Sequence, residues 1–155
     1  MQSTISCVYK VSERCNIDCT YCYFFYGGDE SYKKHPPYAS FDVTQALADF
    51  LRQGCEELEI TKVRVGFHGG EPLMIGPNNM EKMCEIFIET LSGVADVEFT
   101  VQSNAMLVNK RWIEVFNKYK IYPGVSLDGP GIYNDICRID ERGLGTYEAT
   151  IKGLK

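Results

Sequence analysis

Residues 62–93 read KVRVGFHGGEPLMIGPNNMEKMCEIFIETLSG and predict one strand followed by one helix. The opening KVRVGF is rich in β-branched residues, which favour a strand. Further along, apolar residues recur at the spacing of one helical face, namely Met80, Met83, Cys84, Phe87, Ile88 and Leu91. Gly93 follows the last of them, as glycine commonly does after a helix. The stretch is therefore a βα unit with a polar, glycine-rich loop, HGGEP, between strand and helix.

Three further βα units are predicted around this one. TISCVYKVS (4–12) is expected to be a strand, followed by a helix in FDVTQALADFLRQG (41–54) with Asp42 as its N-cap. The apolar face of that helix is expected to carry Val43, Ala46, Leu47, Phe50 and Leu51. The strands VEFTVQ (97–102) and YPGVSL (122–127) then precede helices in NKRWIEVFNKYK (109–120), capped by Asn109, and in GTYEATIKGLK (145–155).

This alternation of strands and helices predicts an α/β fold with a parallel sheet and right-handed crossovers, either doubly wound or rolled into a barrel. A polar or glycine-rich segment follows each strand: SERCNIDC, HGGEP, SNAM and DGPG. These four loops should meet at the carboxyl edge of the sheet, where α/β proteins keep their active sites. Because a closed barrel takes about 250 residues, we expect a partial TIM-type barrel. Residues 1–155 would be the N-terminal part of a longer core domain.

Composition excludes several classes of partner. The chain has 16 Lys and Arg against 21 Asp and Glu, a net charge of -5, and no basic stripe that could bind nucleic acid. No stretch approaches the roughly 18 apolar residues of a membrane span, and the first residues do not resemble a signal peptide. We therefore expect a soluble, cytoplasmic protein. Its seven cysteines are an odd count for a disulfide framework, and in a reducing compartment they favour metal binding or chemistry.

Three of those cysteines lie close together in RCNIDCTYCYFF (14–25), as Cys15, Cys19 and Cys22. Iron–sulfur clusters are held by cysteines at such intervals, normally four, so three would leave one iron open to a ligand. The alternative is a zinc knuckle completed by a distant residue. The obvious candidates for that fourth ligand are poorly placed, because Cys7 falls inside a strand and His35 follows a loop-rich segment. The other cysteines, Cys7, Cys55, Cys84 and Cys137, are expected to be buried small apolar residues.

The segment CNIDCTYC resembles the signature of radical S-adenosylmethionine (radical SAM) enzymes. GGEP (69–72), QSN (102–104) and SLDGP (126–130) are similar to the motifs that follow the second, third and fourth strands of that family. NDICRIDERGLGTYE (134–148) resembles a segment of anaerobic sulfatase-maturating enzymes and of related peptide maturases with a cysteine-rich, SPASM-type C-terminal extension.

The resemblance implies a 4Fe-4S cluster on Cys15, Cys19 and Cys22, with S-adenosylmethionine on the open iron. One electron from a reductant such as flavodoxin or ferredoxin would cleave S-adenosylmethionine to a 5′-deoxyadenosyl radical, which abstracts hydrogen from a peptide or protein substrate. The reaction would be sulfatase maturation or modification of a ribosomal peptide. The rival interpretation is a non-catalytic zinc or iron–sulfur binding module. No catalytic acid or base is identified.

The same resemblance implies the residues that bind S-adenosylmethionine: Tyr21, His68, Gly69, Gly70, Glu71, Asn104, Ser126, Asp128 and Arg138. Ser126 and Arg138 would hold its carboxylate, which suits a guanidinium fork. The backbone at Gly69 and Gly70 would approach its amino group, and Glu71 would either bind that group or hold the loop in place. Tyr21 would lie at the adenine edge and His68 near the ribose.

Each of these residues also has an ordinary structural interpretation. The two glycines could form a simple strand-end turn, and Glu71 could be a solvated carboxylate. Arg138 could be a surface side chain and Tyr21 a packed core residue. The family commonly has Thr-Asn-Gly where this chain has Ser103, Asn104 and Ala105, which keeps the role of Asn104 and leaves the conformation of the turn at Ala105 open.

Overall fold

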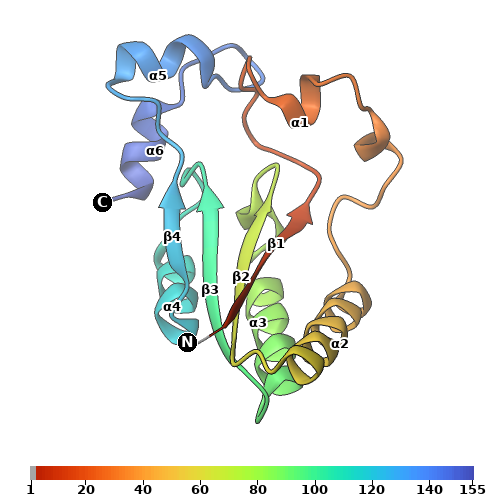
Figure 1. Ribbon diagram of the computed structural model, residues 1–155. Helices are drawn as coiled ribbons and strands as arrows, with labels where there is room; N and C mark the ends of the chain where they lie inside the picture. The colour runs from red at the N-terminus through yellow and green to blue at the C-terminus, as the bar shows by residue number, and fades with distance from the viewer. Residues whose placement is uncertain (1–2) are drawn as a thin grey trace.

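The computed structural model describes residues 3–155 as a parallel sheet with strand order β1-β2-β3-β4. The strands are β1 (Thr4–Ser12), β2 (Lys62–Gly69), β3 (Asp96–Ser103) and β4 (Tyr122–Val125). The helices are α1 (Tyr23–Tyr26), α2 (Phe41–Leu58), α3 (Pro77–Leu91), α4 (Lys110–Tyr119), α5 (Gly131–Cys137) and α6 (Tyr147–Gly153), with 3₁₀ turns η1 (Ser31–Lys33) and η2 (Pro72–Ile75). The predicted fold class, a parallel α/β partial barrel, is confirmed (Figure 1).

The core lies between the sheet and the three long helices α2, α3 and α4, which cover one face (Figure 1). Phe67 and Phe99 stack from neighbouring strands with ring centroids 5.7 Å apart, and Phe87 of α3 packs against Phe99. These aromatic rings are fully or almost fully buried, so they contribute a large share of the apolar area removed from water. No helix within residues 3–155 is both long and apolar enough to cross a membrane.

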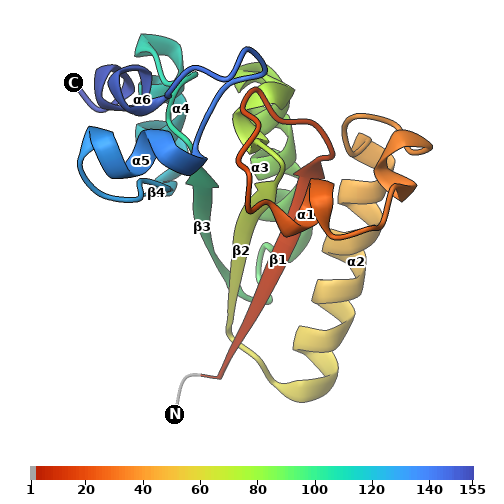
Figure 2. The same cartoon turned by 90° about the horizontal axis from the view of Figure 1, so that it is seen from above.

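The opposite face of the sheet carries no covering helix within the part of the chain that the structure describes. One row across it is formed by Val8, Gly66, Thr100 and Tyr122, which are paired in register on the four strands. Val8 is 70% exposed and Tyr122 is 65% exposed. Both views place α1 near the carboxyl end of β1 and α5 near the carboxyl end of β4 (Figures 1 and 2).

The helix α2 differs from its prediction in both start and face. Its N-cap is Ser40, whose hydroxyl accepts a hydrogen bond from the Val43 amide, so the prediction of Asp42 as the cap is wrong. Its buried residues are Thr44, Ala48, Leu51 and Cys55, whereas Phe50 is 71% exposed. Thr44 can be buried because its hydroxyl lies 2.9 Å from the Tyr9 hydroxyl, which satisfies both groups.

Other predictions hold with small changes. Asn109 caps α4 and accepts from the Trp112 amide, as predicted. The apolar face of α3 is buried except for Ile88, which is 44% exposed. Cys55 and Cys84 are buried as expected, but Cys7 and Cys137 are only half-buried. The short helices α1 and α5 were not predicted.

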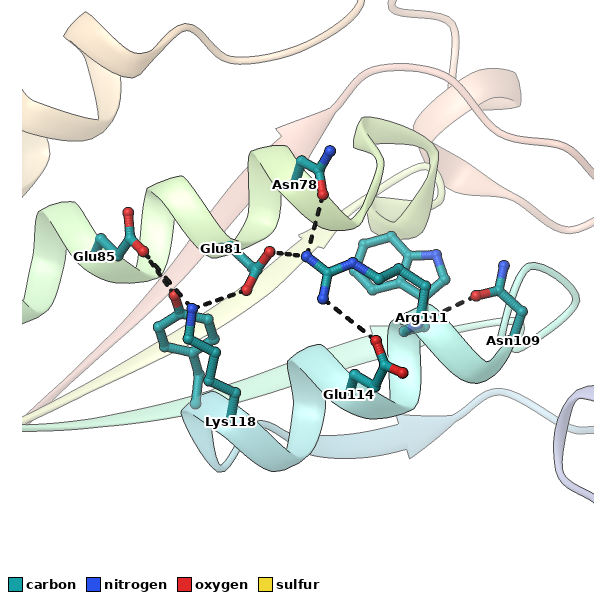
Figure 3. Close-up of polar contacts among 9 residues, drawn as sticks. Asn78, Glu81, Glu85, Asn109, Arg111, Glu114 and Lys118 are labelled. Atoms are coloured by element: carbon teal, nitrogen blue, oxygen red, sulfur yellow. Dashed lines mark hydrogen bonds and ion pairs between the residues drawn. The ribbon is translucent and has the colours of Figure 1, made fainter.

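A network of charged side chains joins α3 to α4 on the outer surface (Figure 3). The Glu81 carboxylate accepts from Arg111 and, at 3.0 Å, from Lys118, and Arg111 also donates to Asn78 at 3.2 Å. The hydrogen bond from Lys118 and the neighbouring Arg111 charge lower the pKa of Glu81. The network therefore favours the folded state whenever Glu81 is ionised.

We predict that Glu81→Gln lowers the free energy of unfolding at neutral pH by no more than about 1 kcal/mol, as expected for an exposed ion pair. Because the folded-state pKa of Glu81 is lowered, the difference from wild type should be complete above the ordinary glutamate pKa of about 4.3. It should disappear as the pH falls through the lower folded value. Urea unfolding at several pH values measures this. Glu114→Gln, which removes only a 3.6 Å contact to Arg111, is the control and should change stability less. A pH-independent difference would contradict the assignment.

Candidate functional site

A cavity of about 460 Å³ lies at the carboxyl ends of the strands, within the size range of small-molecule sites. The loops after all four strands contribute to its lining, as the parallel topology predicts. Every residue predicted to bind the metal or the cofactor lines it: Cys15, Cys19, Cys22, Tyr21, His68, Gly69, Gly70, Glu71, Asn104, Ser126, Asp128 and Arg138. The structure thus brings these residues together, while their roles stay predictions.

The three thiols face this cavity from the loop that connects β1 to α1. Cys19 is buried, and Cys15 and Cys22 are half-buried. Burial raises the pKa of the Cys15 thiol to about 11, and the Ile17 amide partly opposes the increase. Within residues 3–155, no three His, Cys, Asp or Glu side chains are grouped tightly enough to hold a single metal ion. Three cysteines of one short loop are the donor type that iron–sulfur clusters take, so the residues present fit such a cluster.

The cysteine loop is held in place by the segment after α5. The amides of Asp18 and Thr20 donate to the carbonyls of Ile139 and Cys137, at 2.7 and 3.0 Å. These two hydrogen bonds flank Arg138 and bring it beside the cysteine loop. The Arg138 carbonyl accepts from both the amide and the hydroxyl of Thr146, which anchors it to the start of α6. The Arg138 side chain is therefore placed by backbone contacts on two sides.

The Arg138 guanidinium is almost completely buried, with 7% of the residue exposed. Its Nη1 donates to the Tyr21 hydroxyl at 2.8 Å and lies 3.9 Å from Oδ1 of Asp128. Its Nε is buried and has no hydrogen-bond partner among the described residues. A buried donor without a partner is costly, and its presence beside a cavity fits a ligand that supplies an acceptor there. The alternative that Arg138 is a surface residue is wrong.

Glu71 connects the loops that follow β2 and β3. It is 1% exposed, and its carboxylate accepts from the Leu73 amide, the Ser103 hydroxyl and the Asn104 amide at 2.8–2.9 Å. Burial raises the pKa of Glu71, and these hydrogen bonds oppose the increase. The carboxylate is therefore not solvated. Of the two roles left open by the sequence, these contacts favour the one in which Glu71 holds the loops together.

The two glycines before Glu71 allow the β2 loop to pack against the β1 loop. A Cβ on Gly69 would lie 2.2 Å from the Ser12 carbonyl oxygen, and one on Gly70 would lie 2.4 Å from that of Arg14. The amides of Gly70 and Glu71 donate to the same two carbonyls at 2.8 Å. These amides are engaged within the protein, and the Glu71 carbonyl accepts from the Met74 amide at 3.2 Å, which leaves the Gly70 carbonyl as the backbone group that could face a ligand.

The loop after β3 makes two further structural contacts. The side-chain Nδ2 of Asn104 donates to the side-chain oxygen of Asn16 in the cysteine loop at 2.8 Å, and the Oδ1 of Asn104 accepts from the backbone amide of Met106 at 3.1 Å. Ala105 adopts a left-handed conformation with φ of 61°, and its amide donates to the Ser103 hydroxyl. A glycine would adopt this conformation more easily, so the left-handed turn forms here with alanine at the position where the family commonly has glycine. Asn104 therefore joins the β3 loop to the cysteine loop.

Sequence reasoning missed Gln102, which orients Ser126. The Gln102 side-chain amide donates to the Ser126 hydroxyl at 2.8 Å, and the Ser126 amide donates to the Ser103 carbonyl at 2.9 Å. Gln102 is paired with Gly124 on β4, which leaves space for its side chain. The period of β3 places Gln102 on the open face of the sheet, and that signal could have identified it.

His68 and Tyr21 line the cavity from β2 and from the cysteine loop. The Nδ1 atom of His68 is buried and has no partner among residues 3–155. His68 is paired in register with Lys10, which also lines the cavity. Tyr21 is 53% exposed, so the alternative of a packed core tyrosine is wrong. The proximity of His68 to a ribose and of Tyr21 to adenine stays a prediction.

We predict that Gly70→Ala destabilises the fold by at least about 1 kcal/mol, because the new methyl group would overlap the Arg14 backbone. Gly54→Ala is the matched control. Gly54 lies inside α2, where the nearest atom to an added Cβ is 4.0 Å away, so alanine should stabilise by about 0.5–1 kcal/mol. Urea unfolding of both variants measures the pair. Equal stability of Gly70→Ala and wild type would show that the two loops do not pack as described.

Comparison with known proteins identifies similar sequences and folds. A sequence profile described as "Radical SAM superfamily" matches residues 9–155. The serine-type anaerobic sulfatase-maturating enzyme of Klebsiella aerogenes is 27% identical over 146 residues, which are 93% of this chain and 34% of that protein. The chain spans between 34% and 46% of the first three curated relatives that it matches.

Two solved structures share the fold. "Native anSMEcpe with bound AdoMet" has a TM-score of 0.82 at 21% identity, covering 98% of this chain and 40% of that one. "Native anSMEcpe with bound AdoMet and Cp18Cys peptide" has a TM-score of 0.79 at 23% identity, covering 98% and 39%. At these identities the likeness establishes the arrangement of strands and helices.

Proposed function

Since the chain belongs to the radical SAM superfamily, we propose that it holds a 4Fe-4S cluster on Cys15, Cys19 and Cys22 and binds S-adenosylmethionine beside it. The observation that carries this proposal is the convergence of the three thiols and the buried Arg138 on one cavity. When both groups are bound, they supply a one-electron cleavage of S-adenosylmethionine that yields a 5′-deoxyadenosyl radical able to abstract hydrogen from a substrate.

The residues of this chain position the cofactor and exclude water. Arg138 and Ser126 bind the methionine carboxylate, and Gln102 orients the Ser126 hydroxyl through its 2.8 Å hydrogen bond. The free Nε of Arg138 supports this role because a carboxylate can accept from two guanidinium donors at once. The Gly70 carbonyl of the β2 loop is the backbone group proposed to accept from the amino group, since the Gly70 and Glu71 amides donate to the β1 loop and the Glu71 carbonyl accepts from Met74.

We propose a peptide or protein as the substrate. The sulfatase-maturating enzymes among the relatives act on sulfatases by name, and one structural neighbour contains a peptide. The modification would be sulfatase maturation or the oxidation or cross-linking of a ribosomal peptide. A flavodoxin or ferredoxin would supply the electron, and a reducing cytoplasm would keep the thiols available for the cluster.

Metal and sulfide analysis after anaerobic reconstitution tests the cluster. We expect about four irons and equivalent sulfide per chain, and loss of both when Cys15, Cys19 and Cys22 are replaced by Ala together. Cys84→Ala is the control, because this buried thiol of α3 lies outside the cavity; it should keep the iron and lose only packing energy. One zinc without sulfide would contradict the proposal and favour a non-catalytic zinc module.

Equilibrium titration with S-adenosylmethionine tests the role of Arg138. Arg138→Lys should weaken binding about tenfold, because a lysine keeps the charge but cannot make two parallel hydrogen bonds. Arg142→Lys is the matched control, since Arg142 is exposed and pairs with Asp140. Unchanged affinity of Arg138→Lys would remove Arg138 from the cofactor site.

A further inference from the structure

Tyr21 lies between two opposite charges at the edge of the cavity. Its hydroxyl donates to Oδ2 of Asp128 at 2.6 Å and accepts from Nη1 of Arg138 at 2.8 Å. The shortest direct contact between Asp128 and Arg138 is 3.9 Å, between Oδ1 and Nη1. That distance is too long for a hydrogen bond. The carboxylate and the guanidinium are therefore joined through a neutral hydroxyl group.

The backbone fixes Asp128 and Arg138 near each other independently of Tyr21. Asn134 is fully buried, and its side-chain oxygen accepts from the Asp128 amide at 3.3 Å. Its carbonyl accepts from the Arg138 amide at 2.8 Å. Tyr21 arrives from the separate cysteine loop, held there by the hydrogen bond from Thr20 to Cys137. Without the Tyr21 hydroxyl, the two charges would remain neighbours with nothing between them.

The hydrogen bond to Tyr21 determines which guanidinium N–H groups of Arg138 are left to bind a ligand. Nη1 is used by Tyr21, whereas the buried Nε has no partner among the described residues. The Nε and Nη2 groups together form one of the two edges with which a guanidinium binds a carboxylate bidentately. A direct ion pair with Asp128 would turn the guanidinium toward that carboxylate and reduce its ability to bind another.

We infer that Tyr21 is a positioning residue whose hydroxyl stays between the Asp128 carboxylate and the Arg138 guanidinium and prevents a direct ion pair. The Nε–Nη2 edge of the guanidinium then stays open for the carboxylate of S-adenosylmethionine. This inference rests on the proposed function and assigns Tyr21 a role different from contact with adenine. Asp128 then compensates the buried positive charge without occupying its binding edge. The Asp128 side chain is 38% exposed, which gives it the freedom to close on Arg138 when the hydroxyl is removed.

The test compares Tyr21→Phe, Asp128→Asn and the double variant in the reconstituted protein. Equilibrium dialysis under anaerobic conditions measures the Kd of S-adenosylmethionine and of 5′-methylthioadenosine, which lacks the amino and carboxylate groups. Tyr21→Phe should weaken S-adenosylmethionine about tenfold, the effect of losing one charge-assisted hydrogen bond. It should leave the Kd of 5′-methylthioadenosine unchanged.

The double variant is the decisive measurement. The uncharged side chain introduced by Asp128→Asn cannot form an ion pair with Arg138, so Tyr21→Phe with Asp128→Asn should bind S-adenosylmethionine within about threefold of wild type. Asp128→Asn alone should bind S-adenosylmethionine no more weakly than the double variant, because it removes the same charge and keeps the Tyr21 hydroxyl. Tyr133→Phe is the matched control, because this tyrosine is 60% exposed and its hydroxyl makes no hydrogen bond within residues 3–155. This variant should change the Kd of neither ligand. Thermal unfolding confirms that each variant is folded.

The results separate the inference from the function on which it rests. Wild-type affinity in Tyr21→Phe would overturn the inference, and so would a double variant as weak as Tyr21→Phe. Equal loss of both ligands in Tyr21→Phe would also overturn it, because that pattern indicates an adenine contact or a disturbed fold. Failure of the wild-type protein to bind S-adenosylmethionine would overturn the proposed function itself.

Discussion

The buried carboxylate of Glu71 is the contact on which the arrangement of the site depends. It accepts from donors on the β2 and β3 loops at once, and the neighbouring amides of Gly70 and Glu71 donate to the β1 loop. Three loops are thereby fixed relative to one another before any ligand binds. Such a carboxylate is costly to bury, and only the full set of hydrogen bonds offsets that cost. The fixed geometry is what allows thiols and cofactor ligands from distant parts of the chain to share one cavity.

The segment after β4, which carries Arg138, is held in place by hydrogen bonds to its backbone. The segment 137–139 pairs with the cysteine loop through backbone hydrogen bonds, and Thr146 holds the Arg138 carbonyl. Backbone pairing sets the position of Arg138 without using any polar group of its side chain. The guanidinium is then free to combine a buried location with an unpartnered Nε, which is an expensive state for a protein that binds nothing there. The backbone of Arg138 thus holds the loop in place, and its Nε is left without a partner among the described residues.

Much of the site could be predicted because parallel strands bring their carboxyl ends to one edge. The residues after β1, β2, β3 and β4 were therefore expected together, and they line one cavity. The face of α2 was not predictable from apolar periodicity, since one of its core positions is taken by Thr44, whose hydroxyl is satisfied by the Tyr9 hydroxyl and the Ser40 carbonyl. The contact between Tyr21 and Asp128 joins residues 107 positions apart and needs the folded loops. Local sequence patterns carry no information about such a pair.

The open face of the sheet carries a continuation of the cavity. A second hollow of about 360 Å³ follows the row of Val8, Gly66, Thr100 and Tyr122, and it shares His68 and Gln102 with the main cavity. The hollow is deeper at Gly66 and Gly124, because neither residue has a side chain that would project from the sheet into it. Its lining is largely apolar, with the polar His68 and Gln102 where it meets the main cavity, a combination that is common in ligand-binding sites. The two hollows meet at His68 and Gln102, so the lining at the carboxyl ends of the strands continues onto the open face of the sheet.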